Sequence, residues 1–374
     1  MQKKLFTSES VGVGHPDKIC DQISDAILDE CLRQDEDSRV ACEVMASNRL
    51  IVIGGELTTK AYVDVVKKAW EVLFEVGYKE SDFTIITNIN SQSPDISQGV
   101  DKINGEIGAG DQGIMFGYST NETKELMPLP IIMAHSIIKE AEMLRKSNEF
   151  KWAGSDMKSQ VTIDYSDPTK PRIETILMSV QHSEEYNENE FKDFIKNKIL
   201  NKVAKEYNMN TDFNIYINPT GKFVIGGPIG DTGLTGRKII VDTYGGMGRH
   251  GGGAFSGKDY TKVDRSGAYA ARWVANNIVA AELADKVEIQ LSYGIGIADP
   301  ISIALETFGT EKVDKNKILD AIYSVFDLKP ASIIKELKLK KPIYKKTSTF
   351  GHFGRKEFEW EKTNKVLELK KAIK

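Results

Sequence analysis

Apolar residues recur with a period of two in some stretches and of 3.6 in others, and the two patterns alternate in a repeated order. The first occurrence of this order predicts a strand at 4–9, a helix at about 17–33, strands near 39–46 and 50–58, a helix with Tyr62 and Val76 facing inward, and a strand near 83–89. Ile19, Ile23 and Ile27 mark the inward face of the first helix. Gly77 follows the second helix and predicts its C-terminal end.

The same order of strands and helices occurs twice more. The second occurrence predicts a strand at 114–118, a helix at 128–146, strands at 159–166 and 172–181, a helix at 189–206 and a strand at 212–217. The third predicts a strand at 238–243, a helix at 265–284, strands at 286–294 and 300–307, and a helix at 315–325. We therefore expect an α+β fold of three similar β-α-β-β-α-β modules. The expected divisions are an N-terminal module at 1–95, a connecting segment at 96–113, a central module at 114–225 and a C-terminal module at 226–374.

Composition and charge exclude several classes of protein. The chain has 374 residues, 40% of them hydrophobic and 28% charged, which excludes disordered, collagen-like and disulfide-scaffold proteins. The net charge of -4 argues against a general nucleic-acid binder. No stretch approaches the ~18 uncharged residues of a membrane span, and Cys20, Cys31 and Cys42 lack metal-site spacing. These features predict a soluble, cytoplasmic protein with reduced, buried thiols and with neither nucleic-acid nor membrane partners.

Two glycine-rich segments interrupt the regular pattern. Residues 90–113 contain a proline and several glycines with little periodicity, which is typical of a lid, a binding loop or a linker. Thirteen of the 31 glycines lie between Gly221 and Gly257. Because ordering so many glycines is entropically costly, this second segment predicts a backbone that closely approaches a ligand.

A candidate anion site lies at the start of the first predicted helix, in the sequence Gly14-His15-Pro16-Asp17-Lys18. A helix N-terminus presents unpaired N–H groups and the positive end of the helix dipole, and His15 adds a donor. Asp17 suits an anion only if a cation lies between them. The alternative is that Asp17 complements the helix dipole and that His15 is a surface residue.

A second candidate is the stretch 252–259, which nearly matches a phosphate-binding loop. Gly252 and Gly257 are five residues apart and Lys258 follows directly, but Asp259 replaces the Ser or Thr that would hold magnesium, and no clear strand leads into the stretch. A glycine-lined backbone with a lysine can still bind phosphates. Lys262 follows, and then Asp264, which fits either a metal ligand or the N-cap of the next helix.

Further cations and an aromatic residue lie upstream among the glycines. Phe223 could stack on a base, although a phenylalanine beside Val-Ile is more often part of a core. Arg237 and Lys238 could be solvated charges at the start of a strand. The gathering of these cations with Lys222 among glycines favours a nucleotide polyphosphate and a divalent metal. No nucleophile–base motif accompanies them, so we expect a reaction whose nucleophile comes with the substrate.

Several longer motifs resemble one known family. They are Phe6-Thr7-Ser8-Glu9-Ser10, Gly14-His15-Pro16-Asp17-Lys18, Gly108-Ala109-Gly110-Asp111-Gln112-Gly113, the stretch from Asn218-Pro219-Thr220-Gly221 to Asp242-Thr243-Tyr244-Gly245-Gly246, and Gly251 to Asp259. From residue 4 to about 361 the chain resembles the S-adenosylmethionine synthetases, also called methionine adenosyltransferases. The resemblance implies pseudo-threefold symmetry of the modules, with sheets packed together and helices outside. It also implies a gating loop near 92–110, within the glycine-rich stretch.

The resemblance further implies a reaction and its partners. Methionine sulfur attacks C5′ of ATP and displaces triphosphate, which is then hydrolysed to pyrophosphate and phosphate. Thioether sulfur needs no deprotonation, which explains the missing general base. The implied cofactors are two Mg²⁺ ions per site and K⁺, and the implied assembly is a homodimer with shared active sites, commonly paired into a homotetramer. The alternatives are another Mg-ATP-dependent transferase, which would release ADP or AMP, and a non-catalytic nucleotide-binding subunit.

Carried over by position, the family motifs imply roles for individual residues. The implied catalytic residues are His15, Lys158, Arg237, Lys238 and Lys258, and the ATP site would also include Asp156, Lys222, Phe223, Asp231 and Ala254. The implied methionine-site residues are Glu56, Gln92, Asp111, Asp231 and Lys262. Mg²⁺ would be bound by Asp17 and Asp264, and K⁺ by Glu43. The chain departs from the family pattern at Val13, usually a glutamate, and at Lys222, where arginine with its planar fork is frequent.

Overall fold

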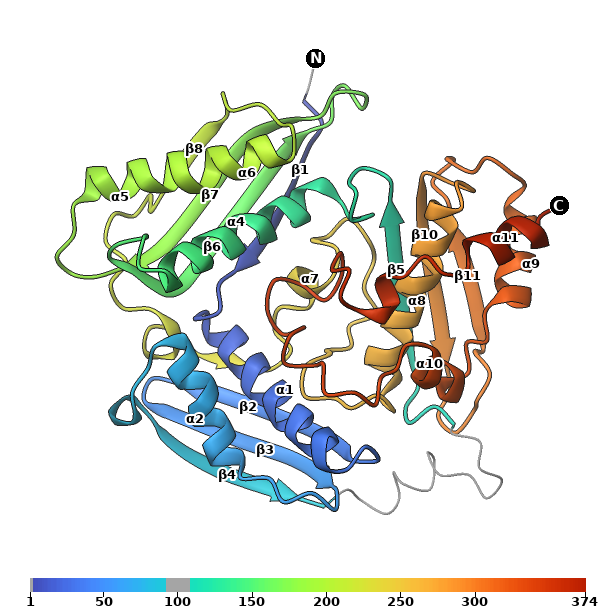
Figure 1. Cartoon of the computed structure of the whole chain (residues 1–374), viewed down its shortest axis with the longest axis horizontal. Helices are drawn as coiled ribbons and strands as arrows, with labels where there is room; N and C mark the ends of the chain where they lie inside the picture. The colour runs from blue at the N-terminus through green and yellow to red at the C-terminus, as the bar shows by residue number, and fades with distance from the viewer. Residues whose placement is uncertain (1–2, 92–107) are drawn as a thin grey trace.

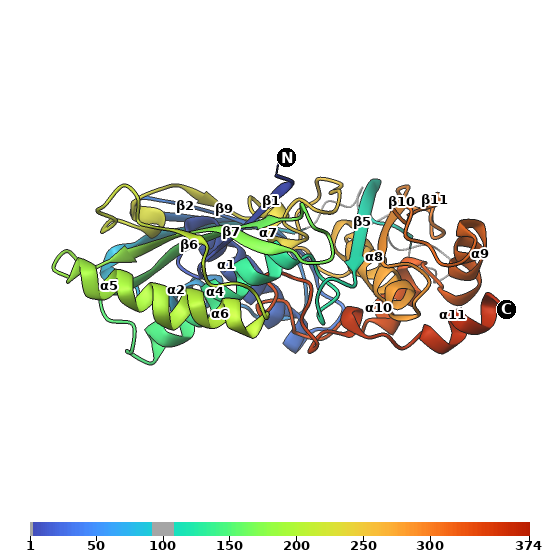
Figure 2. The same ribbon diagram turned by 90° about the horizontal axis from the view of Figure 1, so that it is seen from above.

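The computed structural model describes residues 3–91 and 108–374. Three sheets lie side by side, and helices run along one side of each sheet (Figures 1 and 2). The first segment contains β1 (Leu5–Val11), α1 (Pro16–Gln34), β2 (Arg39–Ser47), β3 (Leu50–Thr58), α2 (Val65–Val76), η1 (Glu80–Asp82) and β4 (Thr84–Asn90). This order confirms the predicted one. Helix α2 ends at Gly77, whose φ of 118° is left-handed, as its position in the sequence predicts.

The later segments also follow the predicted order, with one exception. The second contains β5 (Gly113–Thr120), α4 (Leu129–Lys146), β6 (Ala153–Asp164), β7 (Arg172–His182), a helical run of α5 (Glu188–Phe194), η2 (Ile195–Leu200) and α6 (Asn201–Glu206), and β8 (Asn214–Ile217). The third contains η3 (Gly227–Ile229), β9 (Gly233–Leu234), α7 (Ile239–Asp242), α8 (Val263–Ala280), β10 (Lys286–Tyr293), β11 (Ser302–Glu306), α9 (Lys315–Val325), α10 (Pro330–Glu336), η4 (Glu359–Glu361) and α11 (Val366–Ala372).

The exception is the predicted strand at 238–243, which is wrong, because the short helix α7 occupies this position. Three consecutive β-branched residues at 239–241 favour a strand locally. Residues four apart lie on one face of a helix, however, and both Lys238 and Asp242 bond to side chains at the start of α1. These tertiary ion pairs outweigh the local β preference.

The three sheets exchange strands between segments, which the sequence pattern does not reveal. Strand β1 pairs with β6 in the sheet β1-β6-β7-β8, and β5 pairs with β10 in the sheet β11-β10-β5. Strand β9 pairs with β2 in the sheet β4-β3-β2-β9. As Figure 1 shows, the chain therefore crosses the middle of the molecule between β1 and α1 and again around β9 and α7.

Each sheet packs one face against helices. Strand β2 buries Val40, Cys42 and Val44 toward α1, whereas Glu43 and Met45 point to the opposite face and are exposed. One hydrophobic core joins the N-terminal and C-terminal segments, and a second lies within the central segment between α4, the α5–α6 run and the sheet of β6 and β7. The N-terminal and C-terminal segments thus share one hydrophobic core.

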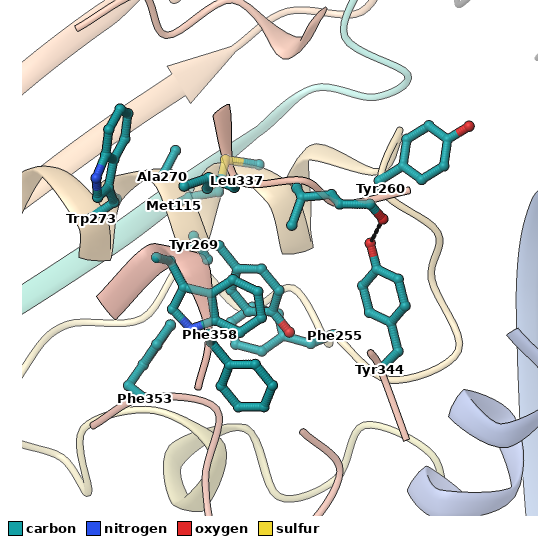
Figure 3. Packing of buried hydrophobic residues seen from close by; sticks show 14 of the residues in the cluster. Met115, Phe255, Tyr260, Tyr269, Ala270, Trp273, Leu337, Tyr344, Phe353 and Phe358 are labelled. Carbon is teal, nitrogen blue, oxygen red and sulfur yellow. Dashed lines mark hydrogen bonds between the residues drawn. The ribbon is translucent and has the colours of Figure 1, made fainter. Parts of the chain in front are cut away.

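Aromatic side chains anchor the glycine-rich stretch beneath α8 (Figure 3). The ring of Phe255 lies 5.6 Å from that of Tyr269 on α8 and 6.3 Å from that of Phe353. Tyr269 also stacks on Trp360, with 3.9 Å between the ring centroids. Burial of these rings fixes the loop on both sides of Phe255, since each large aromatic contributes about 2–3 kcal/mol of hydrophobic stabilisation.

Cys20, Cys31 and Cys42 are all buried and unpaired, which confirms the prediction of buried free thiols. Among the residues that the structure describes, no helix is both long and apolar enough to cross a bilayer.

Candidate active site

His15 is the N-cap of α1 and lies at the junction of α1, β6 and α7. Its side chain is only 3% exposed, so the alternative of a surface histidine is wrong. Burial, followed by the charges of Lys238, Lys158 and Lys18, lowers the pKa of His15 to about 3. Nδ1 accepts a hydrogen bond of 3.2 Å from the backbone N–H of Asp17, which places the proton of the neutral ring on Nε2.

Asp17 ties the start of α1 to the glycine-rich stretch. Its Oδ2 accepts a 2.5 Å hydrogen bond from Nζ of Lys238, and its Oδ1 accepts one of 2.9 Å from the N–H of Leu234. Burial raises the pKa of Asp17, but these two hydrogen bonds outweigh it and hold the pKa below its usual value. Asp17 is therefore an ionised carboxylate that already has a lysine as its partner.

Strand β6 contributes two of the implied ATP-site residues. Lys158 pairs in register with Val11 at the end of β1, and its charge acts on His15. Oδ2 of Asp156 accepts a hydrogen bond of 2.8 Å from the N–H of Gly227, whereas Oδ1 is buried and has no hydrogen-bond partner in the structure. Burial raises the pKa of Asp156 to about 6. An orphaned buried carboxylate oxygen is costly and fits a site that receives a donor from a ligand.

Phe223 and Asp231 flank the same region. The backbone of Phe223 pairs with His182 on β7, and its ring is absent from both hydrophobic cores, so the alternative of a core phenylalanine is not supported. Asp231 is exposed, and its carboxylate accepts a hydrogen bond of 2.9 Å from the N–H of Thr232. The charge of Asp231 also acts on Asp156.

A second lysine–carboxylate pair lies at the start of α8. Nζ of Lys258 donates a hydrogen bond of 2.7 Å to Oδ2 of Asp264. A Cβ on Gly253 would lie 2.4 Å from Oδ1 of Asp264, so a larger residue there would displace this carboxylate. A Cβ on Gly236 would lie 2.4 Å from Cβ of Ala254. The stretch that carries Arg237 thus touches the stretch that leads to Asp264, and this contact joins the two pairs into one candidate site.

The remaining predicted residues lie at the edges of this arrangement or away from it. Lys222 forms an exposed ion pair of 2.9 Å with Glu184, apart from the two lysine–carboxylate pairs. Nζ of Lys262 bonds to the buried Asp259 at 2.5 Å, and the exposed Asp111 accepts a hydrogen bond from its neighbour Gln112. Arg237 is exposed and makes no ion pair with any residue of the described ranges 3–91 and 108–374. Gln92 lies outside the described residues.

Glu43 and Glu56 lie on neighbouring strands of the sheet β4-β3-β2-β9, on the face away from α1. Glu43 is opposite Gly54, and Glu56 is opposite Ala41, two positions along β2. Burial raises the pKa of Glu43, Lys258 opposes the rise, and the carboxylates of Asp21 and Glu56 add to it. A carboxylate whose ionised form is disfavoured by burial and by neighbouring carboxylates is stabilised by a bound cation, which fits Glu43 as a K⁺ ligand.

The carboxylates fit Mg²⁺ that arrives with phosphates rather than a metal held by protein alone. Within the described part of the chain, no three His, Cys, Asp or Glu side chains group as ligands for one ion. Mg²⁺ usually keeps several waters and is bound by one or two carboxylates together with substrate phosphates. Asp17 and Asp264 each offer one carboxylate, and the lysine beside each of them is placed to bind a phosphate.

Sequence reasoning singled out Asp17 but missed the row of buried aspartates on α1 to which it belongs. Asp17, Asp21, Asp25 and Asp29 are spaced four residues apart and accept backbone N–H groups of the C-terminal segment, at Leu234, Gly236, Gly257, and Tyr344 with Lys345 respectively. The guanidinium of Arg265 also donates two hydrogen bonds to the carboxylate of Asp25. The i, i+4 spacing is visible in the sequence, but the predicted inward face contained only apolar residues, whereas α1 is buried on all sides.

The arrangement combines a neutral imidazole, several cations and carboxylates suited to a metal, without a paired nucleophile and base. It can bind a polyphosphate and stabilise it as a leaving group. Comparison with known proteins agrees with this chemistry. Family models for the N-terminal, central and C-terminal domains of S-adenosylmethionine synthetase match residues 3–94, 106–223 and 225–362.

Curated S-adenosylmethionine synthases are similar along the whole chain. The protein of Mycoplasma capricolum subsp. capricolum is 60% identical over 381 residues, which cover 100% of this chain and 98% of the relative. That of Mycoplasmopsis pulmonis is 60% identical over 376 residues, with 100% of both chains covered. That of Treponema denticola is 54% identical over 382 residues, which cover 99% of this chain and 98% of the relative. The chain therefore belongs to the S-adenosylmethionine synthetase family.

Proposed function

We propose that the junction of α1, β6 and α7 holds the triphosphate of ATP while the chain makes S-adenosylmethionine. Methionine adenosyltransferases join methionine sulfur to C5′ of ATP, and the displaced triphosphate is hydrolysed to pyrophosphate and phosphate. The observation that carries the proposal is the placement of the buried His15 beside Lys238, which bonds to Asp17, and near the exposed Lys158 of β6, which is opposite Val11. Lysines in a partly buried site attract a polyphosphate several times more strongly than in bulk water.

His15 acts on the leaving group. Because its Nδ1 accepts the Asp17 N–H, its Nε2–H is free to donate a hydrogen bond to the oxygen that departs from C5′. A neutral imidazole with a pKa of about 3 keeps this donor throughout the physiological pH range. Charge that develops on the leaving oxygen is then stabilised by a donor fixed before the reaction begins.

The two lysine–carboxylate pairs exchange partners when substrate binds. Without ligand, Lys238 neutralises Asp17 and Lys258 neutralises Asp264. With Mg-ATP bound, Lys238, Lys258 and Arg237 would bind the phosphate oxygens, and Asp17 and Asp264 would hold the two metal ions. Mg²⁺ supplies charge neutralisation on the phosphates. Since each group has a partner in both states, the site avoids leaving a buried charge uncompensated.

The other implied residues complete the two substrate sites. Phe223 stacks on adenine, and Asp156, Ala254 and Lys222 line the ATP side. Glu56, Gln92, Asp111, Asp231 and Lys262 form the methionine side, with Glu43 on K⁺. The unpartnered Oδ1 of Asp156 supports a donor from the ribose or base there.

A homodimer with shared active sites, able to pair into a homotetramer, is part of the same proposal. Leu234, Met45, Val52 and Ile86 stand opposite one another across four strands of the sheet β4-β3-β2-β9. Met45 is 39% and Ile86 is 51% exposed, and this row lies on the face away from α1. Such an apolar row fits packing of this sheet against its copy, beside Glu43 and Glu56.

We also propose that the three segments are related by pseudo-threefold symmetry and that the protein is cytoplasmic.

Replacement of Lys238 by methionine tests the phosphate site, with Lys202→Met as the control. Lys202 also forms an ion pair of 2.8 Å with a carboxylate, Glu140, but it lies on the surface of the central segment. Lys238→Met is expected to lower kcat/KM for ATP by roughly 100-fold or more, the usual cost of one charged contact in a transition state. Lys202→Met should leave it within about twofold. Equal effects of the two variants would contradict the site.

A further inference from the structure

We propose that Lys18 and Asp21 are positioning residues that hold the segment 236–242 at both ends and thereby direct Arg237 and Lys238 toward the phosphate site. This inference rests on the proposed phosphate site. Neither residue is among the motif residues with a substrate or metal role. Both lie on α1 and are fully buried, so their action on the reaction must pass through other groups.

The first end of the segment is held by Asp21. Its Oδ1 accepts a hydrogen bond of 2.8 Å from the N–H of Gly236, the residue directly before Arg237. Gly236 has a φ of 77°, and there is no room for a Cβ beside Ala254. The chain therefore turns sharply at this point, and the bond to Asp21 fixes the direction in which Arg237 and Lys238 leave the turn.

The second end is held by Lys18. Its Nζ bonds to Oδ1 of Asp242, the last residue of α7, and donates a second hydrogen bond of 2.9 Å to Oδ2 of Asp21. Asp21 thus contacts one end of the segment directly and the other through Lys18. The backbone N–H of Asp242 in turn donates a hydrogen bond of 2.8 Å to the carbonyl of Lys238, which transmits the position of Asp242 to the phosphate lysine.

The signs of the charges fix the register between α1 and α7. Asp17 pairs with Lys238, the N-cap of α7, and Lys18 pairs with Asp242, the last residue of α7. Two neighbouring residues of α1 with opposite charge therefore meet residues that lie one helical turn apart. A shift of α7 by one turn would bring Lys238 toward Lys18 or Asp242 toward Asp17. Because like charges repel strongly in a buried site, only the observed register is favourable.

The bonds of Lys18 to Asp21 and Asp242 become important when the ion pair of Asp17 and Lys238 opens. In the proposed phosphate site, bound Mg-ATP would separate Lys238 from Asp17, since Lys238 would bind a phosphate and Asp17 would hold a metal ion. Lys18 is 1% exposed, so a phosphate cannot reach it, and its bonds to Asp21 and Asp242 persist. Lys18 is also the only charged cation within ion-pair distance of either carboxylate in the described residues, because burial holds the pKa of His352 well below its ordinary value and keeps that ring neutral.

The experiment compares Asp21→Asn and Asp242→Asn with Asp29→Asn. Asp29 is a matched control, because it lies on the same row of α1 and accepts two backbone hydrogen bonds, of 2.8 and 2.9 Å, from a segment without implied phosphate ligands. For each purified full-length variant, KM for ATP, KM for methionine, kcat and Tm are measured, together with KM for hydrolysis of added tripolyphosphate. Lys238→Met is included as the direct phosphate contact.

Asp21→Asn and Asp242→Asn are expected to raise KM for ATP and for tripolyphosphate about tenfold, as loss of one charged hydrogen bond would, and to leave KM for methionine within about twofold. Asp29→Asn should lower Tm without changing either phosphate KM. Asp242→Asn keeps Lys18 paired with Asp21 and so remains a folded test if Asp21→Asn does not fold.

Two results would overturn the inference and can be told apart. If Lys238→Met raises both phosphate KM values but Asp21→Asn and Asp242→Asn behave like Asp29→Asn, the positioning role is wrong and the phosphate site stands. If Lys238→Met also leaves both values unchanged, the phosphate site is wrong and the inference falls with it.

Discussion

Gly257 occupies a position that no other residue can fill, and Gly257→Ala should displace the loop that carries Lys258. Its φ is 80°, and a Cβ would lie 2.0 Å from the backbone oxygen of Cys42 on β2. Its N–H donates a hydrogen bond of 2.8 Å to Asp25, and its carbonyl accepts one of 2.9 Å from the N–H of Cys42. Because the obstacle is backbone, no side-chain rotation relieves the overlap, and the shift passes directly to Lys258.

The magnitude follows from three contributions. A left-handed φ costs an alanine about 1–2 kcal/mol. The bond to the Asp25 carboxylate contributes roughly 1.5–3 kcal/mol and the neutral bond to Cys42 about 1 kcal/mol, and both are strained or broken. Alanine also lowers the conformational entropy of the unfolded chain, which offsets about 0.4–1 kcal/mol of this loss. The expected net loss for Gly257→Ala is about 3–5 kcal/mol.

Gly252→Ala is the control, because Gly252 has a φ of 95° but no atom within 4 Å of its Cβ position. It bears only the backbone strain and should lose about 1 kcal/mol. Urea unfolding followed by circular dichroism gives the loss of stability, and KM for ATP reports the displacement of Lys258. If the losses of unfolding free energy for Gly257→Ala and Gly252→Ala differ by less than about 1 kcal/mol, the close approach of Gly257 to β2 does not explain the need for glycine at this position.

Three further predictions concern the buried ion pair of Asp25, the stability of the protein at acidic pH and the assembly. Asp25→Asn leaves the fully buried Arg265 without its ion-pair partner and should cost about 3–5 kcal/mol in urea unfolding; a loss below about 1 kcal/mol would contradict that pairing. Burial, then the charges of Lys18 and Arg355, lowers the pKa of His135 to about 3, so unfolding takes up a proton as pH falls below 6.5. Stability should therefore fall by about 1.4 kcal/mol per pH unit between pH 6.5 and 3 for this residue. His135→Gln should reduce the measured slope by the same amount, which corresponds to one proton. Ile86→Lys should halve the mass of the assembly in sedimentation; an unchanged mass would exclude the exposed row as the interface.

Much of the element order could be predicted because it depends on local periodicity. The helix at about 17–33 and the strands near 39–46 and 50–58 agree closely with α1, β2 and β3. The sheets could not be predicted, since the alternation in β1 is the same whether it pairs with β2 or with β6. The strand predicted at 238–243 failed because its competitor, the bonding of Lys238 and Asp242 to α1, lies more than 220 residues away in sequence.

The candidate site was predictable where a motif carries its own chemistry. The glycines before Lys258 and the proline after His15 indicate a phosphate-binding backbone and a helix start without any tertiary information. The supporting shell was not predictable, because a buried aspartate such as Asp21 looks in sequence like any solvated carboxylate. Only the fold shows that it receives the N–H of Gly236 and the charge of Lys18.

The most direct test of S-adenosylmethionine synthesis by this protein is product analysis of the purified protein with ATP, L-methionine, MgCl₂ and KCl. Chromatography should detect S-adenosylmethionine, pyrophosphate and phosphate in equal amounts, with no ADP or AMP. Formation of ADP or AMP without S-adenosylmethionine would assign the cationic site to a different transfer reaction. Bound ATP with no product would contradict the catalytic role altogether.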